Sequence, residues 1–230
     1  MSAYDSALIA HGDLPYAQSY KYDAWPERRE GDREMEFRLT YKGKLPAASS
    51  SDGRVKDKHR IRQALHLQLR ELWQSDPILR TLFRENKGTG RPHFELLADD
   101  YARCGYRFLP LVGSPASDEA CSLDILFLRR DQPGSLVTHG GDIDNRVKVL
   151  LDALRMPEGC DEVYGNTPTA DEEPFFCLLT DDKIITEIRV VTDRLLTPRE
   201  PGEYEHDVHL IIHVKTITYS RKMPLFDWVQ

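Results

Sequence analysis

The stretch GGDIDNRVKVLLDALRMP (residues 140–157) places Asp142 and Asp144 two residues apart at the start of a helical pattern. Lys148 and Asp152 follow Asp144 at intervals of four residues, which sets all three on one stripe of a helix. A neighbouring face is apolar and consists of Val147, Leu150, Leu151 and Leu154. The pattern therefore predicts a helix that packs on the core and carries acids at its first turn.

Two interpretations of these acids stay open. In the first, Asp144 caps the helix and pairs with Lys148, because free N–H groups and the positive end of the helix dipole stabilise carboxylates. In the second, the acids hold a divalent cation against a phosphate, with Lys148 near a phosphate oxygen. The stretch LLTDDKIITEI (178–188) supplies two more carboxylates, Asp181 and Asp182, although such a pair is also typical of an exposed turn.

The composition predicts a globular protein with its own core. The chain has 230 residues, 40% of them hydrophobic and 30% charged, which suits one large domain or two small ones. No stretch approaches the ~18 apolar residues of a membrane span, and no secretory signal is evident, so we expect a cytoplasmic protein. The cysteines are widely spaced without a C-x-x-C pair, which predicts reduced thiols: Cys104, Cys121, Cys160 and Cys177.

Charge is unevenly distributed along the chain. The net charge of −7 is unfavourable for binding nucleic acid, but residues 158–182 hold eight acids and no Lys or Arg, which leaves the remainder near +1. Residues 54–70 hold six Lys or Arg against Asp57 alone. A local patch of one sign influences association more than the total does.

Hydrophobic periodicity predicts a mixed α+β domain, since strands and helices alternate around one core. We expect helices at 57–74, with Asp57 as N-cap and Ile61, Leu65, Leu69 and Leu72 on the buried face, at 76–85, and in the opening stretch. We expect strands at 35–43, within 93–112, at 121–130, from about 183, and at 206–219. Residues 1–34 show no period and are expected to form an irregular extension.

The two acidic stretches together resemble a known family. The pattern Asp142-x-Asp144-Asn145, Lys148, Asp152-Ala-Leu, followed by the Asp181-Asp182 pair, is similar to the RusA family of Holliday junction resolvases. The order of elements resembles the family over about residues 35–220, although only these two motifs are specific. The resemblance implies a RusA-like nuclease domain at 35–222 with an acidic insertion at about 155–180, and a tail at 223–230.

The resemblance also implies a function. Members of the family are homodimeric, Mg²⁺-dependent endonucleases that cut branched DNA, and Mn²⁺ is expected to substitute for Mg²⁺. The family's metal ligands fall on Asp142, Asp144 and Asp182, and its catalytic lysine falls on Lys148. Supporting or alternative groups are Asn145, Asp152 and Asp181. Neither a small-molecule cofactor nor a membrane is implied.

Basic residues near these motifs are candidates for contacts with the DNA backbone, which position DNA without reading its sequence. The candidates are Arg54, Lys56, Lys58, Arg60, Arg62 and Arg146. The acidic insertion departs from the family pattern, and beside the site it would repel DNA unless it folds away.

Two alternatives remain. Asp181-Asp182-Lys183 contains the D-x-K core of the PD-(D/E)xK nucleases, a signal of only three residues. The other is a non-cleaving binder of branched nucleic acid, or of a protein partner, on the same fold. A zinc site at His209 and His213 is disfavoured because no third ligand stands at a suitable spacing.

Overall fold

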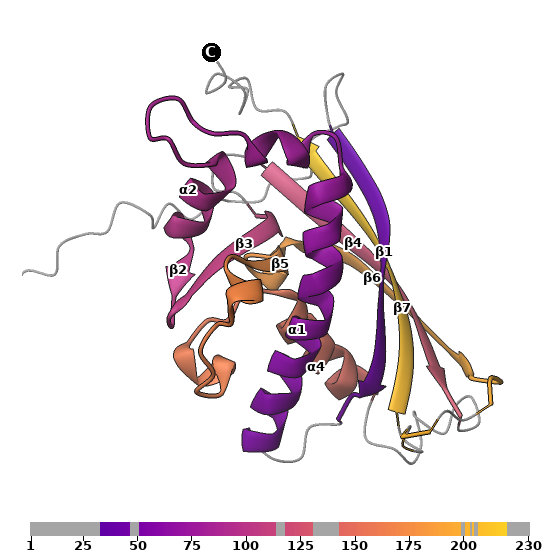
Figure 1. The fold of residues 1–230 in the computed structure, drawn as a ribbon. Helices are drawn as coiled ribbons and strands as arrows, with labels where there is room; N and C mark the ends of the chain where they lie inside the picture. The colour runs from indigo at the N-terminus through magenta and orange to yellow at the C-terminus, as the bar shows by residue number, and fades with distance from the viewer. Residues whose placement is uncertain are drawn as a thin grey trace, which may run out of the picture.

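The computed structural model describes residues 33–46, 51–113, 118–130, 143–198, 201–202, 204 and 207–219, with only the backbone described at 51–54. These residues form two mixed β-sheets and the helices α1 (Ser51–Ser75), α2 (His93–Asp100) and α4 (Ile143–Leu154) (Figure 1). The predicted α+β class is confirmed. Residues 1–32 of the expected extension and the whole expected tail lie outside the described residues, whereas residues 33 and 34 begin the first strand.

The larger sheet has four strands in the order β1 (Arg33–Lys44), β7 (Asp207–Tyr219), β4 (Asp118–Arg129) and β6 (Ile185–Arg194). β7 is antiparallel to both β1 and β4, whereas β6 is parallel to β4. Along β7 every second residue is buried, as the period of a half-buried strand requires: Val208, Leu210, Ile212 and Val214. This sheet therefore has one face on the core, and β1 and β6 are its edges.

The smaller sheet has the order β2 (Ala102–Arg103), β3 (Tyr106–Val112) and β5 (Phe175–Leu179). β5 is parallel to β3, and all five of its residues are buried. Its sequence, FFCLL, is the continuous apolar run of a fully buried strand. The last part of the expected acidic insertion is thus a strand of the core.

Helix α1 lies between the two sheets, packed on β5, β1 and α4 (Figure 1). Its predicted apolar face is confirmed: Ile61, Leu65 and Leu69 are buried, and Leu72 is partly buried. The predicted N-cap is wrong, because the helix begins at Ser51 and Asp57 lies inside it. The buried Asp57 carboxylate instead pairs with Arg60 at 3.2 Å, one turn further on.

Other predicted elements are confirmed in part. Residues 93–112 begin with α2 before strands β2 and β3, and residues 79–83 form a 3₁₀ helix rather than an α-helix. In α4 the buried face is rotated from the prediction and includes Val149 and Ala153, while Val147 and Leu151 are only partly buried. No helix among the described residues is long and apolar enough to cross a membrane.

A disulfide joins Cys104, in the turn between β2 and β3, to Cys160 at the start of a 3₁₀ helix (Cys160–Val163). The prediction of reduced thiols is wrong for this pair, and Cys121 and Cys177 are free and buried. The two bonded cysteines are 56 residues apart in sequence. Their proximity comes from tertiary packing, so spacing along the chain gave no signal.

Candidate active site

Helix α4 carries most of the predicted site residues. Asp144 lies in its first turn with an exposed side chain, Asn145 is partly buried, and Lys148 is exposed one turn further on. Asp142 lies outside the described residues. The exposed stripe of α4 is therefore available to a ligand at the two positions described, Asp144 and Lys148.

The Asp181-Asp182 pair directly follows β5. Asp181 caps a short 3₁₀ helix, η4 (Asp182–Ile184), and its carboxylate accepts hydrogen bonds from the backbone N–H of Lys183 at 2.9 Å and from Lys183 Nζ at 3.3 Å. Lys183 is thus paired with the first aspartate and leaves the second to other partners. This local turn explains why two adjacent acids stand where the sequence predicted the entry to a strand.

Packing brings α4 and the aspartate pair together. α4 contacts both β5 and η4. Beyond the helix, the N–H of Met156 donates to the carbonyl of Leu179 at 2.9 Å, two residues before Asp181. The two motifs, which are separated by the whole insertion in sequence, are neighbours in the fold.

Electrostatics indicate which part of α4 faces Asp182. Burial raises the pKa of the Asp182 carboxyl, the adjacent Asp181 raises it further, and Asp152 adds to the effect while Arg155 opposes it. In Asp181, burial also raises the pKa, but the hydrogen bonds from Lys183 outweigh it and the pKa is lowered. Asp182 therefore lies near the C-terminal half of α4. Asp152, in that half, lies two helical turns, about 12 Å, beyond Asp144.

Asp152 also links α4 to α1. Its carboxylate pairs with Lys58 Nζ at 2.6 Å and lies 3.6 Å from Arg155 Nη2. The side chains of Lys58 and Asp152 are largely shielded from solvent, which strengthens their attraction. Asp152 therefore ties α4 to α1 close to Asp182, and the supporting role expected for it stays a prediction.

The donor chemistry suits a hard divalent cation, because all the candidate ligands are carboxylates. The pKa of Asp182 is raised first by burial and then by the adjacent Asp181, and a bound cation would favour its ionised form. Among the described side chains, however, no three His, Cys, Asp or Glu residues are grouped so that they could hold a metal ion. The predicted set of three includes Asp142, which lies outside the described residues.

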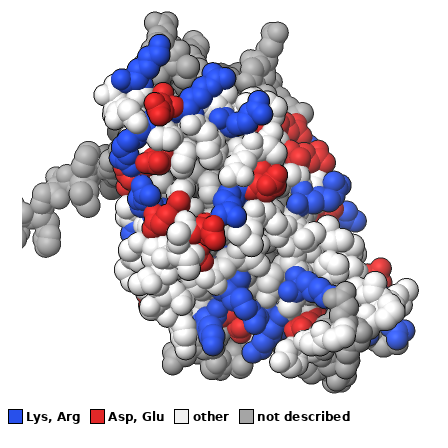
Figure 2. Space-filling view, in the orientation of Figure 1, with Lys and Arg blue, Asp and Glu red and all other residues white. Residues whose placement is uncertain are grey.

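The predicted DNA-contacting residues divide into two groups. Figure 2 shows Lys and Arg side chains gathered at the end of the molecule where α1 begins. Lys56 is exposed there, Arg60 has a half-exposed side chain, and Lys58 is turned towards Asp152. The side chain of Arg54 lies outside the described part of the chain.

Arg62 and Arg146 belong to the interior. Arg62 is 1% exposed, and its guanidinium group donates to the carbonyls of Asp152 and Arg155 at 2.8 and 3.1 Å. Arg146 is buried and donates to the carbonyl of Leu45. Both guanidinium groups tie backbone segments together, so we omit them from the DNA-binding surface.

The acidic insertion folds against α1, and several of its acids have partners elsewhere in the fold. Glu162 binds both Arg62 and Arg155, at 3.3 and 3.0 Å. Three more acids of the segment have partners: Asp171 with Arg70, Glu172 with Gln63, and Glu173 with Arg107. Two ion pairs, Arg62–Glu162 and Arg70–Asp171, thus join the basic run of 54–70 to the acidic run of 158–182, and the opposite signs of the runs were the available sequence signal.

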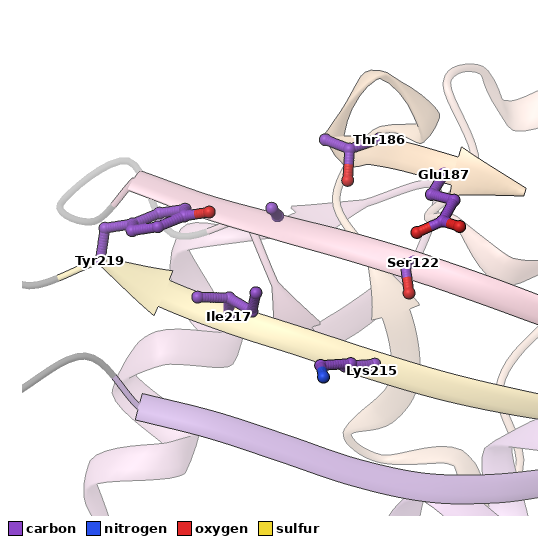
Figure 3. Close-up of a pocket in the computed structure, with 7 residues that line it drawn as sticks. Ser122, Thr186, Glu187, Lys215, Ile217 and Tyr219 are labelled. Carbon is purple, nitrogen blue, oxygen red and sulfur yellow. The ribbon is translucent and has the colours of Figure 1, made fainter. Parts of the chain in front are cut away.

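A groove of about 340 Å³ lies on the outer face of the larger sheet, lined by Ala120, Ser122, Thr186, Glu187, Lys215, Ile217 and Tyr219 (Figure 3). It lies where the β4–β6 register shifts between Cys121 and Ser122. Lys215 Nζ pairs with Glu34 at 2.5 Å, and Glu187 is the groove's single acid. This arrangement suits neither a metal ion nor a phosphate, so the aspartates beside α4 remain the better candidate.

No family model, no curated protein and no solved structure matches this chain.

Proposed function

We propose that this protein is a metal-dependent endonuclease of the RusA type that hydrolyses phosphodiesters in branched DNA. The observation that carries the proposal is the packing of η4 against α4, which sets Asp182 beside the C-terminal half of the helix whose first turn carries Asp144. Two acidic motifs on packed elements, with exposed cations on α1, supply the residue types that metal-assisted phosphodiester hydrolysis uses. A DNA substrate also fits the cytoplasmic location expected from the sequence.

Each residue would have a distinct task. Asp142, Asp144 and Asp182 would bind Mg²⁺ or Mn²⁺, which would activate a water molecule and polarise the scissile phosphate. Lys148 would donate to a phosphate oxygen and stabilise the charge that develops there. Lys56 and Arg60 would contact the backbone of the same strand further along. Asp152, held by Lys58, would keep α4 against α1.

A cleavage assay tests the proposal. The protein is incubated with a mobile four-way junction, a linear duplex and single strands, in Mg²⁺, Mn²⁺ or EDTA. We expect paired nicks in the junction only when metal is present, and loss of nicking in Asp142→Asn, Asp144→Asn and Asp182→Asn. The matched control is Asp193→Asn, which removes an exposed carboxylate from β6. Junction cleavage by Asp182→Asn at the parental rate would refute the site assignment.

A second candidate is a binder of branched DNA that does not cleave. It is favoured by the absence, among the described side chains, of a ready-made group of three metal ligands. Calorimetric titration with Mn²⁺ separates the two functions. A nuclease binds metal through Asp182 and loses that binding in Asp182→Asn, whereas a simple binder holds the junction equally well in EDTA and never nicks it.

A further inference from the structure

The disulfide between Cys104 and Cys160 joins two turns that differ in their accessibility. Cys160 is exposed at the start of its 3₁₀ helix, whereas Cys104 is partly buried and packs against the buried cluster around Tyr106 and Phe175. Thiol–disulfide exchange depends on which sulfur an attacking thiolate can reach. A thiolate from solution therefore reaches Cys160 first, and Cys104 is the leaving group.

The backbone at Cys104 indicates that this residue serves through its sulfur. Cys104 and Gly105 form the two-residue turn between β2 and β3, in which Arg103 pairs with Tyr106, and their φ angles are 56° and 80°. Turns of this kind favour Asn, Asp or Gly at the first position, because a positive φ is unfavourable for most residues with a Cβ. Cysteine brings none of that turn chemistry, so its contribution here is the bond to Cys160.

The two remaining cysteines do not compete for exchange. Cys121 and Cys177 are buried, and burial raises the pKa of both thiols to about 12. The thiolate is the form that attacks a disulfide, so these two residues remain unreactive thiols near neutral pH. Thiol chemistry is therefore confined to the Cys104–Cys160 pair.

The disulfide fixes two carboxylates on one buried cation. Cys160 stands midway between Glu158 and Glu162, and both carboxylates pair with Arg155 Nη2, at 3.4 and 3.0 Å. The side chain of Arg155 is 6% exposed, so these attractions are weakly screened by water. The bond thus holds the short segment 158–162 over Arg155.

The rest of this connection has few restraints of its own. The chain between α4 and β5 runs from 155 to 174, which is 20 residues, and contains only two short 3₁₀ helices. Connections of this length without longer helices or strands are usually functional. Among the described residues, 164–170 hydrogen-bond only within the insertion, to Val163 and Glu172. The disulfide is therefore the covalent restraint on the first half of a long connection.

We propose that Cys104–Cys160 is a site of thiol–disulfide exchange, and that its reduction by a dithiol releases the segment 158–162 from Arg155. One thiolate of the dithiol attacks Cys160 Sγ, the bond to Cys104 breaks, and Cys104 leaves as a thiolate that takes up a proton. The second thiol of the dithiol then displaces Cys160, which is protonated in turn. The protein gains two electrons and two protons, and the dithiol becomes a cyclic disulfide.

Reduction would also change the charge beside the candidate site. Arg155 Nη2 lies 3.6 Å from Asp152, and the charges of both residues act on Asp182. Once Glu158 and Glu162 are no longer fixed on Arg155, its positive charge is less fully balanced and repels a cation bound nearby. The reduced protein should therefore bind Mn²⁺ more weakly. This consequence rests on the proposed metal site, whereas the exchange and the release do not.

Proteolysis in the two redox states tests the release. The protein is purified without reductant, and one half is treated with dithiothreitol. Alkylation of the folded protein followed by mass spectrometry should label Cys104 and Cys160 only after reduction. A serine protease that cleaves after Glu should then cut after Glu162 about tenfold faster in the reduced form, because cleavage follows the population of the opened segment. Cleavage after Glu85, which is exposed in another loop, should not change.

The matched control is Cys160→Ser, which cannot form the bond. Its cleavage after Glu162 should equal that of the reduced parent and should not respond to dithiothreitol. Mn²⁺ titration compares this variant with the oxidised parent, since dithiothreitol itself binds metal, and we expect about threefold weaker binding in the variant. Circular dichroism checks its fold, and the two redox forms of the parent decide the proposal if the variant does not fold.

Three results would overturn the proposal. They are free Cys104 and Cys160 thiols in the protein purified without reductant, equal cleavage after Glu162 in the two redox forms, and acceleration by dithiothreitol in Cys160→Ser. Equal Mn²⁺ affinity in the oxidised parent and the variant would remove the link to Asp182. Absence of Mn²⁺ binding in both would instead refute the metal site, and proteolysis would still decide the release.

Discussion

The two edges of the larger sheet show how one fold treats equivalent strands differently. β1 and β6 both leave one side without a neighbouring strand, yet Gln68 and Arg60 close β1, whereas no described side chain closes β6. The open edge follows directly from Asp182, and the closed edge lies against α1. The difference suggests that the β1 side contributes mainly to stability and that the β6 side is kept accessible for function.

The largest expected effect is on the rate of junction cleavage, which should depend on the β6 side of the sheet and not on the β1 side. Asp182→Asn should lower junction cleavage about a thousandfold, because a metal ligand contributes several kcal/mol to the transition state. Gln68→Ala, at the closed edge, should leave the rate per folded molecule within about twofold. Single-turnover kinetics on a four-way junction provide the measurement. Equal losses in the two variants would remove the functional distinction between the edges.

The next effect is on the free energy of unfolding and concerns Arg62, which holds α1 in place beside the closed β1 edge. Arg62→Met should lower the free energy of unfolding by about 3–5 kcal/mol, because it leaves two buried carbonyl groups without their donor and removes one of the two cations that bind Glu162. Urea denaturation measures the change. The matched substitution Arg38→Met, at an exposed position of β1, should cost less than about 0.5 kcal/mol. A similar cost at both positions would contradict the buried role of Arg62.

A smaller effect concerns Gln68, whose side-chain amide closes the β1 edge. Gln68→Ala removes both hydrogen bonds to the Thr40 backbone and should lower the free energy of unfolding by about 1–2 kcal/mol. Gln74→Ala, at an exposed position of the same helix, is the control and should change stability by less than about 0.5 kcal/mol. Hydrogen exchange at the Thr40 amide should accelerate only in the Gln68 variant. Unchanged exchange there would show that the edge is closed by other means.

The smallest effect is the pH dependence of stability that Asp182, on the β6 side, contributes. The pKa of Asp182 is raised in the folded protein, so its ionisation opposes folding as the pH rises from the unfolded pKa through the folded one. Asp182→Asn should therefore match the parent in stability near pH 3 and exceed it at pH 7, by less than ~1 kcal/mol because the carboxyl is partly exposed. Thermal unfolding between pH 3 and 7 measures the difference. A constant difference across this range would contradict the raised pKa.

Much of the fold could be predicted because its elements follow regular periods. The alternation of β7 and the i, i+4 face of α1 are local patterns, and both were assigned correctly. β5 was not assigned, since a continuous apolar run such as FFCLL has no period to distinguish a strand from a buried helix. The Cys104–Cys160 bond and the closed edge depend on contacts between distant segments.

The candidate site was predicted less completely for the same reason. The sequence identified α4 and the Asp181-Asp182 pair, but not which turn of α4 the pair would approach. Asp152, expected in a supporting role, is the acid of α4 that influences Asp182. Arg62 looked like a surface cation because helical periodicity does not reveal that the facing segment is acidic and covers it. The approach of Asp182 to Asp152 and the burial of Arg62 were both missed because each depends on two segments that are far apart in the sequence.

The pairing of β1 with β7 has a consequence for biosynthesis. Of the described strands, β1 is the first to leave the ribosome and its sheet neighbour β7 is the last, since Arg33 pairs with Thr218. During translation Gln68 can shield one side of β1 early, while the other side waits for almost the whole chain. Nascent chains stalled or truncated before residue 207 would therefore expose a long unpaired strand, and they should depend on chaperones far more than the finished protein does.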